Sequence, residues 1–396
     1  MVDPFLPDAQ KIAAIREMLP ATGAGIYVDA LSAGPFPAET ARALAEADEW
    51  ELRVGRAGAG REEDVGQRED EARAVIAALL SADPSDIVIT HGPGEAQAQV
   101  ALSLPPSVSD RWVLVAGGDP RALAAIRGVA TARGAVAMEV AADSAAESLL
   151  AGTGLLILPH VDERSGAVLP VTELSRLAHD AGALVLLDAS ASAGAVPIDP
   201  EELEVDALAF SAHRWLLGPE GVGAVWMGAR LKALVEPWAL RERLDRPPRR
   251  STLGLARSLG WLEMYVGLPW ANGRTAALAH ALADAVAAID HVELATPVDR
   301  MAAIVTFRVY GWTEEEALEE LGRRVFALIG TVDVEGEPAL RASVGFWNTE
   351  EELTRLASAV AELAAHTPET MPRRPSLVVL RDVAVQAADS DGNDRP

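Results

Sequence analysis

Two neighbouring stretches of the sequence decide the fold: ALVLLDASASAGAVPID at residues 183–199 and DALAFSAHRWLLGPEGVGAVWMGARL at residues 206–231. Each contains a short apolar run that stops at polar residues, the first at Asp188 and the second at Ser211-Ala212-His213-Arg214. Short aliphatic runs of this kind are typical of strands buried on both faces of a sheet. The two stretches therefore predict strands whose ends carry polar side chains.

The same pattern continues on both sides of these stretches. Further apolar runs, expected to be strands, lie at residues 85–90, 111–116, 154–158 and 223–227. Segments rich in alanine and leucine with three-to-four spacing, expected to be helices, lie at residues 71–81, 120–133 and 171–181. Strands that alternate with helices predict an α/β fold with a mainly parallel, doubly wound sheet covered on both faces.

The pattern changes at LDRPPRRSTLG, residues 244–254, where two prolines and three arginines predict a loop. A long helical stretch follows at 255–290, with an interruption expected near Pro269. Beyond it the sequence predicts a smaller α+β unit, with strands at 303–309 and 340–345 and helices at 313–329 and 349–364.

We therefore expect five parts along the chain. They are an N-terminal arm at 1–20, a large α/β domain at 21–255, a connecting helix at 256–290, a small α+β domain at 291–382 and a disordered tail at 383–396. The tail is assigned from its polar and acidic composition.

Composition narrows the possible functions. The chain has 396 residues, and its 34 basic and 59 acidic side chains give a formal net charge of −25. Such a surface repels phosphate backbones and anionic lipid, so we expect no nucleic-acid or membrane partner. The acidic first residues do not resemble a signal peptide, so we expect a cytoplasmic protein. Cysteine is absent, which excludes disulfides, thiolate metal ligands and persulfide carriers; no metal site is expected.

The two opening stretches resemble the aminotransferase class V family, the pyridoxal-phosphate enzymes of fold type I. That group includes cysteine desulfurases, isopenicillin-N-epimerase-like proteins and kynureninases. Four further segments resemble the family in the same order along the chain: GIYVDALSAGPFP (25–37), DPSDIVITHGPGEAQAQVALSL (83–104), LPHVDERSGAVLPVTELSRLAHDAGA (158–183) and LRASVGFWNTEEELTRL (340–356). The resemblance covers roughly residues 20–365 and implies a fold-type-I architecture with pyridoxal phosphate as cofactor.

The resemblance places an arginine at the family's catalytic lysine. The residue after Ser-x-His forms the internal aldimine in the family, and here it is Arg214. A Schiff base needs a neutral amine, whereas guanidinium stays protonated. The chain has only two lysines, Lys11 before the matched fold and Lys232 beyond the following strand. We therefore expect that no internal aldimine forms.

Four other cofactor contacts of the family have changed. Gly94 stands where a threonine hydroxyl would hold the phosphate, although backbone amides near Gly94 and Glu95 can still bind an anion. Pro120 lies near the position of the residue that stacks on the pyridine ring, and neither it nor Asp119 can stack as an imidazole does. Ala191 replaces a glutamine, and Glu163 replaces an asparagine.

Other positions match the family. The resemblance implies that Asp188 pairs with the pyridine nitrogen, that Ser211 and His213 contact the phosphate, and that Arg341 binds a substrate carboxylate. Ser251 and Thr252 lie near where the family sends a hydroxyl to the partner subunit's phosphate, so Thr252 is a candidate cofactor ligand and a homodimer is expected.

Each of these residues also has a structural interpretation. Asp188 can be a turn residue, His213 a hydrogen-bonded structural histidine and Arg341 a surface ion-pair residue. Ser251 and Thr252 are loop residues by default. His91 and His160 are expected to be structural.

Three functional hypotheses remain open. The first is a degenerate family member that binds a ligand, such as a small carboxylate, or a partner protein without catalysis. The second is an enzyme that reuses the cleft without covalent cofactor, with Asp188, Glu163, His91 or His213 as general base. The third is a non-covalent pyridoxal-phosphate binder. Because two buried carboxylates need a cation, we predict that Arg214 pairs with Asp188, with Glu163 or with both.

Overall fold

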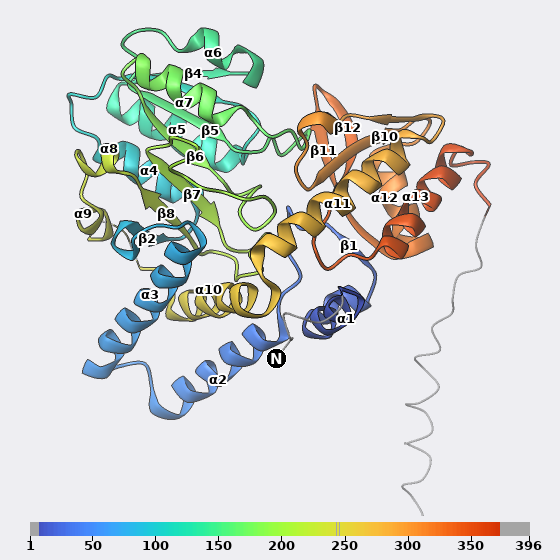
Figure 1. Ribbon diagram of the computed structural model, residues 1–396, viewed down its shortest axis with the longest axis horizontal. Helices are drawn as coiled ribbons and strands as arrows, with labels where there is room; N and C mark the ends of the chain where they lie inside the picture. Colours follow the sequence, from blue (N-terminus) through green and yellow to red (C-terminus); the bar gives the residue numbers. More distant parts are fainter. Residues whose placement is uncertain (1–7, 243, 245, 373–396) are drawn as a thin grey trace, which may run out of the picture.

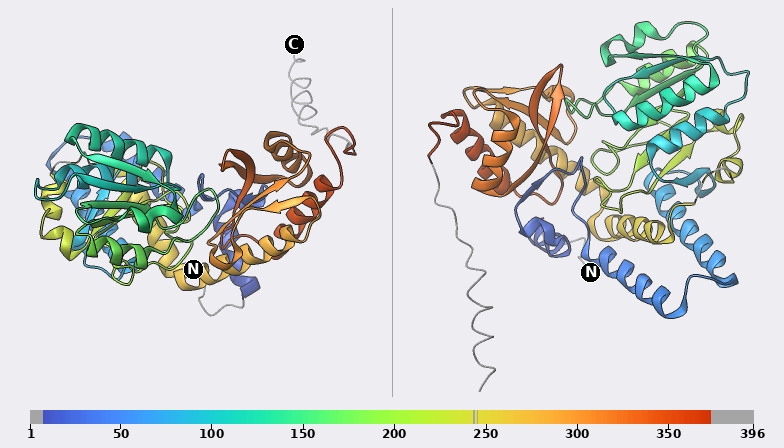
Figure 2. Two further views of the ribbon diagram at one scale, coloured as in Figure 1. Left: turned by 90° about the horizontal axis from the view of Figure 1, so that it is seen from above. Right: turned by 180° about the vertical axis from the view of Figure 1, so that it is seen from behind.

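The computed structural model describes residues 8–242, 244 and 246–372. The chain forms two lobes, each built around its own sheet, and helix α11 (Leu268–Ala287) runs from one lobe into the other (Figures 1 and 2). The tail expected at 383–396 lies outside the described residues. Within the described part, no helix combines the length and the apolar character that a membrane crossing requires.

The larger lobe contains a seven-stranded sheet in the order β2-β8-β7-β6-β5-β3-β4. Its strands are β2 (Ile87–Thr90), β3 (Arg111–Val115), β4 (Val136–Val140), β5 (Leu155–Pro159), β6 (Leu184–Asp188), β7 (Ala207–Ser211) and β8 (Gly223–Met227). Strands β3 to β7 pair in parallel, and β8 alone of the described strands of this sheet runs in the opposite direction, antiparallel to both β7 and β2. The predicted mainly parallel sheet is confirmed.

Helices cover both faces of this sheet. The central strands β5 and β6 are almost entirely apolar, and their alternate side chains enter two separate cores: Leu156 and Val185 lie in one, Leu155 and Leu184 in the other. The α-helices that precede α11 in the described chain are α1 (Asp8–Met18), α2 (Ala38–Val54), α3 (Ala59–Leu79), α4 (Pro93–Ser103), α5 (Pro120–Arg133), α6 (Ala145–Ser148), α7 (Val171–Asp180), α8 (Ala229–Lys232), α9 (Pro237–Arg241) and α10 (Arg249–Trp261). The doubly wound architecture is therefore confirmed.

The smaller lobe contains a five-stranded sheet in the order β1-β11-β12-β10-β9. Its strands are β1 (Ile26–Val28), β9 (Val292–Leu294), β10 (Ile304–Val309), β11 (Ala327–Val334) and β12 (Glu337–Ser343), and α12 (Glu314–Val325) and α13 (Glu350–Ala364) pack on it with α11. A capping box of Thr349 and Glu352 fixes the start of α13. The predicted α+β unit is confirmed.

Two strands of the smaller sheet differ from the sequence-based expectation. The helix expected to reach residue 329 ends at Val325, because Phe326 adopts a left-handed conformation and the β-branched run of β11 follows. Strand β1, within the range 21–255 assigned to the large domain, pairs in parallel with β11 of the smaller sheet. The large-domain range therefore includes one strand that belongs to the smaller sheet.

The loop prediction for 244–254 is wrong in its second half. Helix α10 begins at Arg249, after Pro248 at its N-cap, so Ser251 and Thr252 are helical. Pro247 and Pro248 precede the helix and so do not interrupt it, and Arg249 in its first turn forms ion pairs with Asp64 and Glu51. The predicted interruption near Pro269 is confirmed: Gly267, with φ of 79°, separates a π-helical turn at 262–266 from α11.

Candidate functional site

Polar residues gather where four parallel strands of the larger sheet end. Strands β3, β5, β6 and β7 run in the same direction, so their carboxyl ends lie at one edge, where α/β proteins commonly bind ligands. The segments that follow these ends carry Asp119, Glu163, Asp188 and Arg214. We call this group the strand-end cluster.

Arg214 and Glu163 form the central contact of the cluster. Arg214 Nη1 donates to Glu163 Oε1 at 2.5 Å, and Nη2 lies 4.0 Å from Asp119 Oδ2. The side chains of Arg214 and Glu163 are 8% and 13% exposed. Burial raises the pKa of Glu163, and the charge of Arg214 partly opposes that shift. The predicted pairing of Arg214 with Glu163 is confirmed.

Asp188 ends β6 beneath this pair. Its Oδ1 accepts a hydrogen bond from the backbone N–H of Ser190 at 2.9 Å. Burial raises the pKa of Asp188, while Ser190 and the charge of Arg214 oppose the shift. Among the described residues Asp188 forms no ion pair with Arg214, so a fork joining both carboxylates to Arg214 is the wrong arrangement. The guanidinium is turned towards β5 and α5 instead.

The smaller sheet contributes Arg341 from β12. Arg341 Nη1 donates to the backbone carbonyl of Glu163 at 3.3 Å, so both arginines contact the same residue. Because β12 lies between β10 and β11, Arg341 is on a central strand and not at a sheet edge. Burial lowers the pKa of Arg341, and the charges of Asp29 and Glu163 oppose this.

Asp29 is a charged residue of this region that sequence reasoning missed. It follows β1, and a side chain at Gly330 of β11 would contact both the Asp29 carboxylate and the Arg341 guanidinium. Burial raises the pKa of Asp29 despite the hydrogen bond from Ser32 and the charge of Arg341. The pairing of β1 with β11 and the bridge between Asp29 and Ser343 of β12 bring Asp29 here, and no local pattern in the sequence indicates either contact.

Several buried polar atoms around the cluster lack hydrogen-bond partners within the described residues. They are Arg214 Nε, Arg341 Nε, His213 Nδ1, Ser190 Oγ and Ser211 Oγ. Burial, reinforced by the charge of Arg214, lowers the pKa of His213, which favours the neutral ring. Buried polar groups are normally paired, so this concentration of unpaired groups, most of them donors, is typical of a site for an acceptor-rich ligand.

The turn before α4 carries the other predicted anion-binding residues. Gly94 and Glu95 lie in the first turn of α4, and Glu95 Oε2 accepts hydrogen bonds from the backbone N–H of His91 at 2.7 Å and from its ring Nδ1 at 3.1 Å. Pro93, at the start of the helix, has no N–H to offer. The N-terminus of α4 therefore presents fewer backbone N–H donors than an ordinary helix N-terminus, and the carboxylate of Glu95 already lies beside it.

Two other candidates lie apart from the cluster's charged side chains. Thr252 is buried within α10, at 2% exposure, which does not suit the exposed loop position expected of it. His160 follows β5 and donates its backbone N–H to the carbonyl of Asp188. Burial lowers the pKa of His160 to about 4, so the ring is neutral, consistent with a structural role.

Comparisons with known proteins complete the description of this site. The sequence profile of the aminotransferase class-V family matches residues 26–243, more than half of the chain. The chain belongs to the aminotransferase class-V family. The matched range contains every member of the strand-end cluster but not Arg341.

Individual relatives agree with this assignment. The chain is 24% identical over 398 residues to a probable cysteine desulfurase of Methanothermobacter thermautotrophicus, covering 88% of this chain and 97% of that protein. It is 29% identical over 240 residues to isopenicillin N epimerase of Amycolatopsis lactamdurans, covering 54% of this chain and 60% of the epimerase.

Solved structures confirm the fold-type-I architecture. An apo cysteine desulfurase from Thermococcus onnurineus matches with a TM-score of 0.77 at 21% identity, covering 92% of this chain and all of that one. The cystine C-S lyase C-DES in complex with cysteine persulfide matches with a TM-score of 0.78 at 20% identity, covering 87% and 99%.

Pyridoxal phosphate is the cofactor of the aminotransferase class-V family, so the fit of this site to it can be examined. Lys11, on α1, lies 4.1 Å from the ring centroid of Trp270, and Lys232, on α8, is 2.6 Å from Asp86. Neither lysine belongs to the strand-end cluster, which offers the cofactor no primary amine. Together with Pro93 and Gly94 in the phosphate turn, these residues do not fit a covalently held cofactor.

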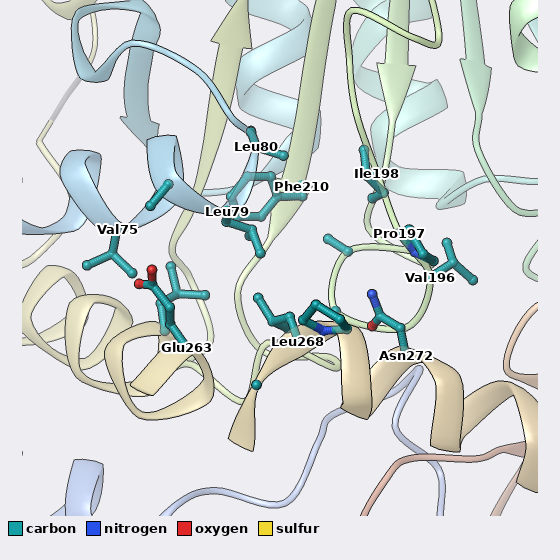
Figure 3. Close-up of a pocket in the computed structure, with 16 residues that line it drawn as sticks. Val75, Leu79, Leu80, Val196, Pro197, Ile198, Phe210, Glu263, Leu268 and Asn272 are labelled. Atoms are coloured by element: carbon teal, nitrogen blue, oxygen red, sulfur yellow. The ribbon is translucent and has the colours of Figure 1, made fainter. Parts of the chain in front are cut away.

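An apolar groove elsewhere in this class-V chain is separate from the cluster. It has a volume of about 370 Å³ and lies between the end of α3, the 193–198 loop and the start of α11. Figure 3 shows Leu79, Leu268 and Pro197 lining it, with Glu263 and Asn272 on opposite sides. None of the predicted site residues lines this groove.

Proposed function

We propose that this chain is a class-V family member that forms no internal aldimine and serves as a non-catalytic binding protein for a small carboxylate ligand. The observation that carries the proposal is the Arg214–Glu163 contact. A guanidinium occupies the position that the family resemblance assigns to the catalytic lysine, and it is held by a buried carboxylate of the same chain.

The chemistry of the side chains supports the loss of covalent catalysis. Guanidinium nitrogens are poor nucleophiles because the group stays protonated at all physiological pH values. The two lysines are engaged with Trp270 and Asp86, on α11 and before β2. Because the cluster contains no primary amine, it has no group that could form the internal aldimine on which the family's catalysis depends.

Binding is supported by the donors that remain. Arg214 and Arg341 both contact Glu163, and each keeps an Nε without a partner in the described part of the chain. Arginine forks recognise carboxylates through parallel hydrogen bonds. A small carboxylate is therefore the ligand class that suits this site.

The alternative is an enzyme that reuses the cleft without covalent cofactor. One observation favours it: His213 has a lowered pKa because of burial, and its buried Nδ1 has no partner among the described residues. A neutral imidazole of this kind can act as a general base. Turnover that is lost in His213→Asn would favour this alternative over simple binding.

We also propose that the chain forms a homodimer. Near its end, helix α2 exposes Trp50 at 49% and Val54 at 63%, which lie four residues apart on one face of the helix. Clustered apolar side chains of this size usually mark an interaction surface. Sedimentation at micromolar concentration tests this, and a monomer would contradict it.

The visible absorbance spectrum tests the proposed function. Protein incubated with pyridoxal phosphate and then desalted is expected to show no aldimine band. Arg214→Lys is expected to recover little of it, because the phosphate-turn hydroxyl, the stacking residue and the glutamine are also replaced. A tight yellow complex of the unaltered protein would overturn the proposal.

A further inference from the structure

We propose that Glu163 is a built-in competitor for the ligand of the strand-end cluster: its carboxylate occupies the Arg214 site that the ligand's carboxylate takes when Glu163 is displaced. This inference deepens the proposed binding function and rests on it. It assigns Glu163 a regulatory role, because ligand binding must first break a contact within the chain.

The first step of the argument is the incompleteness of the Arg214–Glu163 pair. A carboxylate and a guanidinium can form two parallel hydrogen bonds, but here only Nη1 to Oε1 is made, at 2.5 Å. Arg214 Nη2 is 4.0 Å from Asp119, beyond hydrogen-bond distance, and Nε has no partner in the described residues. Glu163 thus holds the guanidinium by one edge and leaves donors for a second acceptor.

The second step is the position of Glu163 relative to both arginines. Its side chain contacts Arg214, and its backbone carbonyl accepts from Arg341 Nη1 at 3.3 Å. The backbone is fixed independently, since the Glu163 N–H donates to the carbonyl of Gly117 at 2.7 Å. The backbone contacts of Glu163 therefore do not depend on its side-chain contact with Arg214, and the proposal requires only that the side chain changes rotamer.

The third step is the charge balance. The groups that face Glu163 are Arg214, Arg341, Asp188 and Asp119. Bringing an anionic ligand beside these carboxylates is unfavourable unless one negative charge is lost. Burial raises the pKa of Glu163, so the displaced side chain can take up a proton as the ligand arrives, and the total charge of the cluster stays constant. Ligand binding should accordingly be tighter at lower pH.

The fourth step is the chemistry of the ligand. Arg214 offers Nε and Nη2, Arg341 offers Nε, and Ser211 contributes a buried hydroxyl without a partner in the described part of the protein. These donors suit the two oxygens of one carboxylate and a second acceptor on the same small molecule. An uncharged amide of the same shape offers one acceptor oxygen and no charge, so it loses the charge-assisted, two-oxygen pairing with the guanidinium groups.

Chemical rescue tests this inference with the full-length protein. Glu163→Ala removes the competitor and leaves space for a small carboxylate beside Arg214. We expect this variant to melt at a lower temperature than the unaltered protein, and saturating acetate to raise its melting temperature by roughly 3–5 °C. Acetamide at the same concentration, and chloride at the same ionic strength, should leave it unchanged.

Asp119→Ser provides the matched control, because it removes the other carboxylate near Arg214 while keeping an N-cap for α5. Acetate should stabilise Asp119→Ser no more than the unaltered protein. In calorimetric titrations, Glu163→Gln should bind acetate about tenfold more tightly than the unaltered protein, and the difference should shrink as the pH falls towards the pKa of Glu163. If Glu163→Ala does not fold without acetate, folding in acetate but not in acetamide supports the inference equally.

The inference is overturned if acetate and acetamide act alike on Glu163→Ala, or if Glu163→Gln binds acetate no better than the unaltered protein. Either result leaves the proposed function standing when no aldimine band forms. Conversely, a covalent pyridoxal-phosphate complex of the unaltered protein would remove the proposed function whatever acetate does.

Discussion

Two arginine–glutamate pairs in this protein have opposite surroundings. Arg16 of α1 binds Glu352 of α13 through both of its terminal nitrogens, at 2.7 and 3.1 Å, and the same nitrogens donate to the carbonyls of Thr22 and Trp347. Arg214 binds Glu163 through one nitrogen, and its Nε has no partner in the described residues. Both glutamates are largely buried.

Under the proposed binding function, the difference separates a structural arginine from one that is available to a ligand. Arg16 uses each terminal nitrogen twice and ties α1 to the start of α13, where Glu352 also completes a capping box. Burial has removed water from the Arg214 guanidinium, and protein acceptors replace only some of the hydrogen bonds that the water made. This is unfavourable unless another molecule supplies the missing acceptors. Burial of an ion pair alone therefore does not indicate its role, whereas the completeness of its hydrogen bonds does.

Breaking the complete pair should have the largest effect on stability. Arg16→Met leaves Glu352 without its cation and removes four hydrogen bonds that Arg16 donates. We expect a loss of about 3–4 kcal/mol in the free energy of unfolding, measured by urea denaturation. A loss below about 1 kcal/mol in the free energy of unfolding would mean that the Arg16–Glu352 pair stabilises the protein no more than an exposed ion pair does. The contrast between a complete and an incomplete pair would then be contradicted.

His160, buried where it follows β5, should give the stability a strong dependence on pH. Burial lowers the pKa of His160 from 6.5 to about 4, so between these values the unfolded chain binds the proton and the native chain does not. Stability is therefore present above pH 6.5 and is lost as the pH falls to 4, by about 3 kcal/mol for this residue.

His160→Gln isolates that contribution. Urea denaturation at several pH values should show a shallower loss for the variant than for the unaltered protein over this interval, whatever the difference at neutral pH. Parallel curves would show that His160 is not held neutral by burial, and the description of the strand ends as a desolvated region would have to be revised.

Breaking the incomplete pair should have the smallest effect. Arg214→Met removes a buried cation whose hydrogen bonds are only partly made, and Glu163 can respond by taking up a proton, so we expect a loss of about 1–2 kcal/mol at neutral pH. The loss should shrink at acid pH, because Arg214 stabilises Glu163 by charge only when the carboxylate is ionised. An effect as large as that of Arg16→Met would assign Arg214 a purely structural role.

Local sequence signals were sufficient for the larger sheet and for the central contact of the cluster. Strands β3, β5 and β8 lie within one residue of their predicted bounds, and β6 and β7 end at the predicted Asp188 and Ser211, because continuous apolar runs between helical segments are a local pattern. The parallel order then brings the residues after these strands together, so the contact between Arg214 and Glu163 follows from sequence and topology.

Long-range pairings limited the prediction elsewhere. Strand β1 has only three residues and joins β11 about 300 positions later, and Asp29 reaches Arg341 through that pairing and its own bridge to Ser343 of β12. The start of α10 depends on ion pairs between Arg249 and residues of α2 and α3. The geometry that leaves Asp188 outside the Arg214 pair is set by the direction of one side chain, which the sequence does not specify.

The central claim is that Arg214, held by Glu163, has replaced the amine that anchors the family's cofactor. Borohydride reduction of the full-length protein after incubation with pyridoxal phosphate, followed by peptide mass spectrometry, tests it most directly. The account predicts that the peptide containing Arg214 keeps its unmodified mass and that no stoichiometric adduct appears on Lys11 or Lys232. A stoichiometric pyridoxyl adduct on either lysine would contradict it.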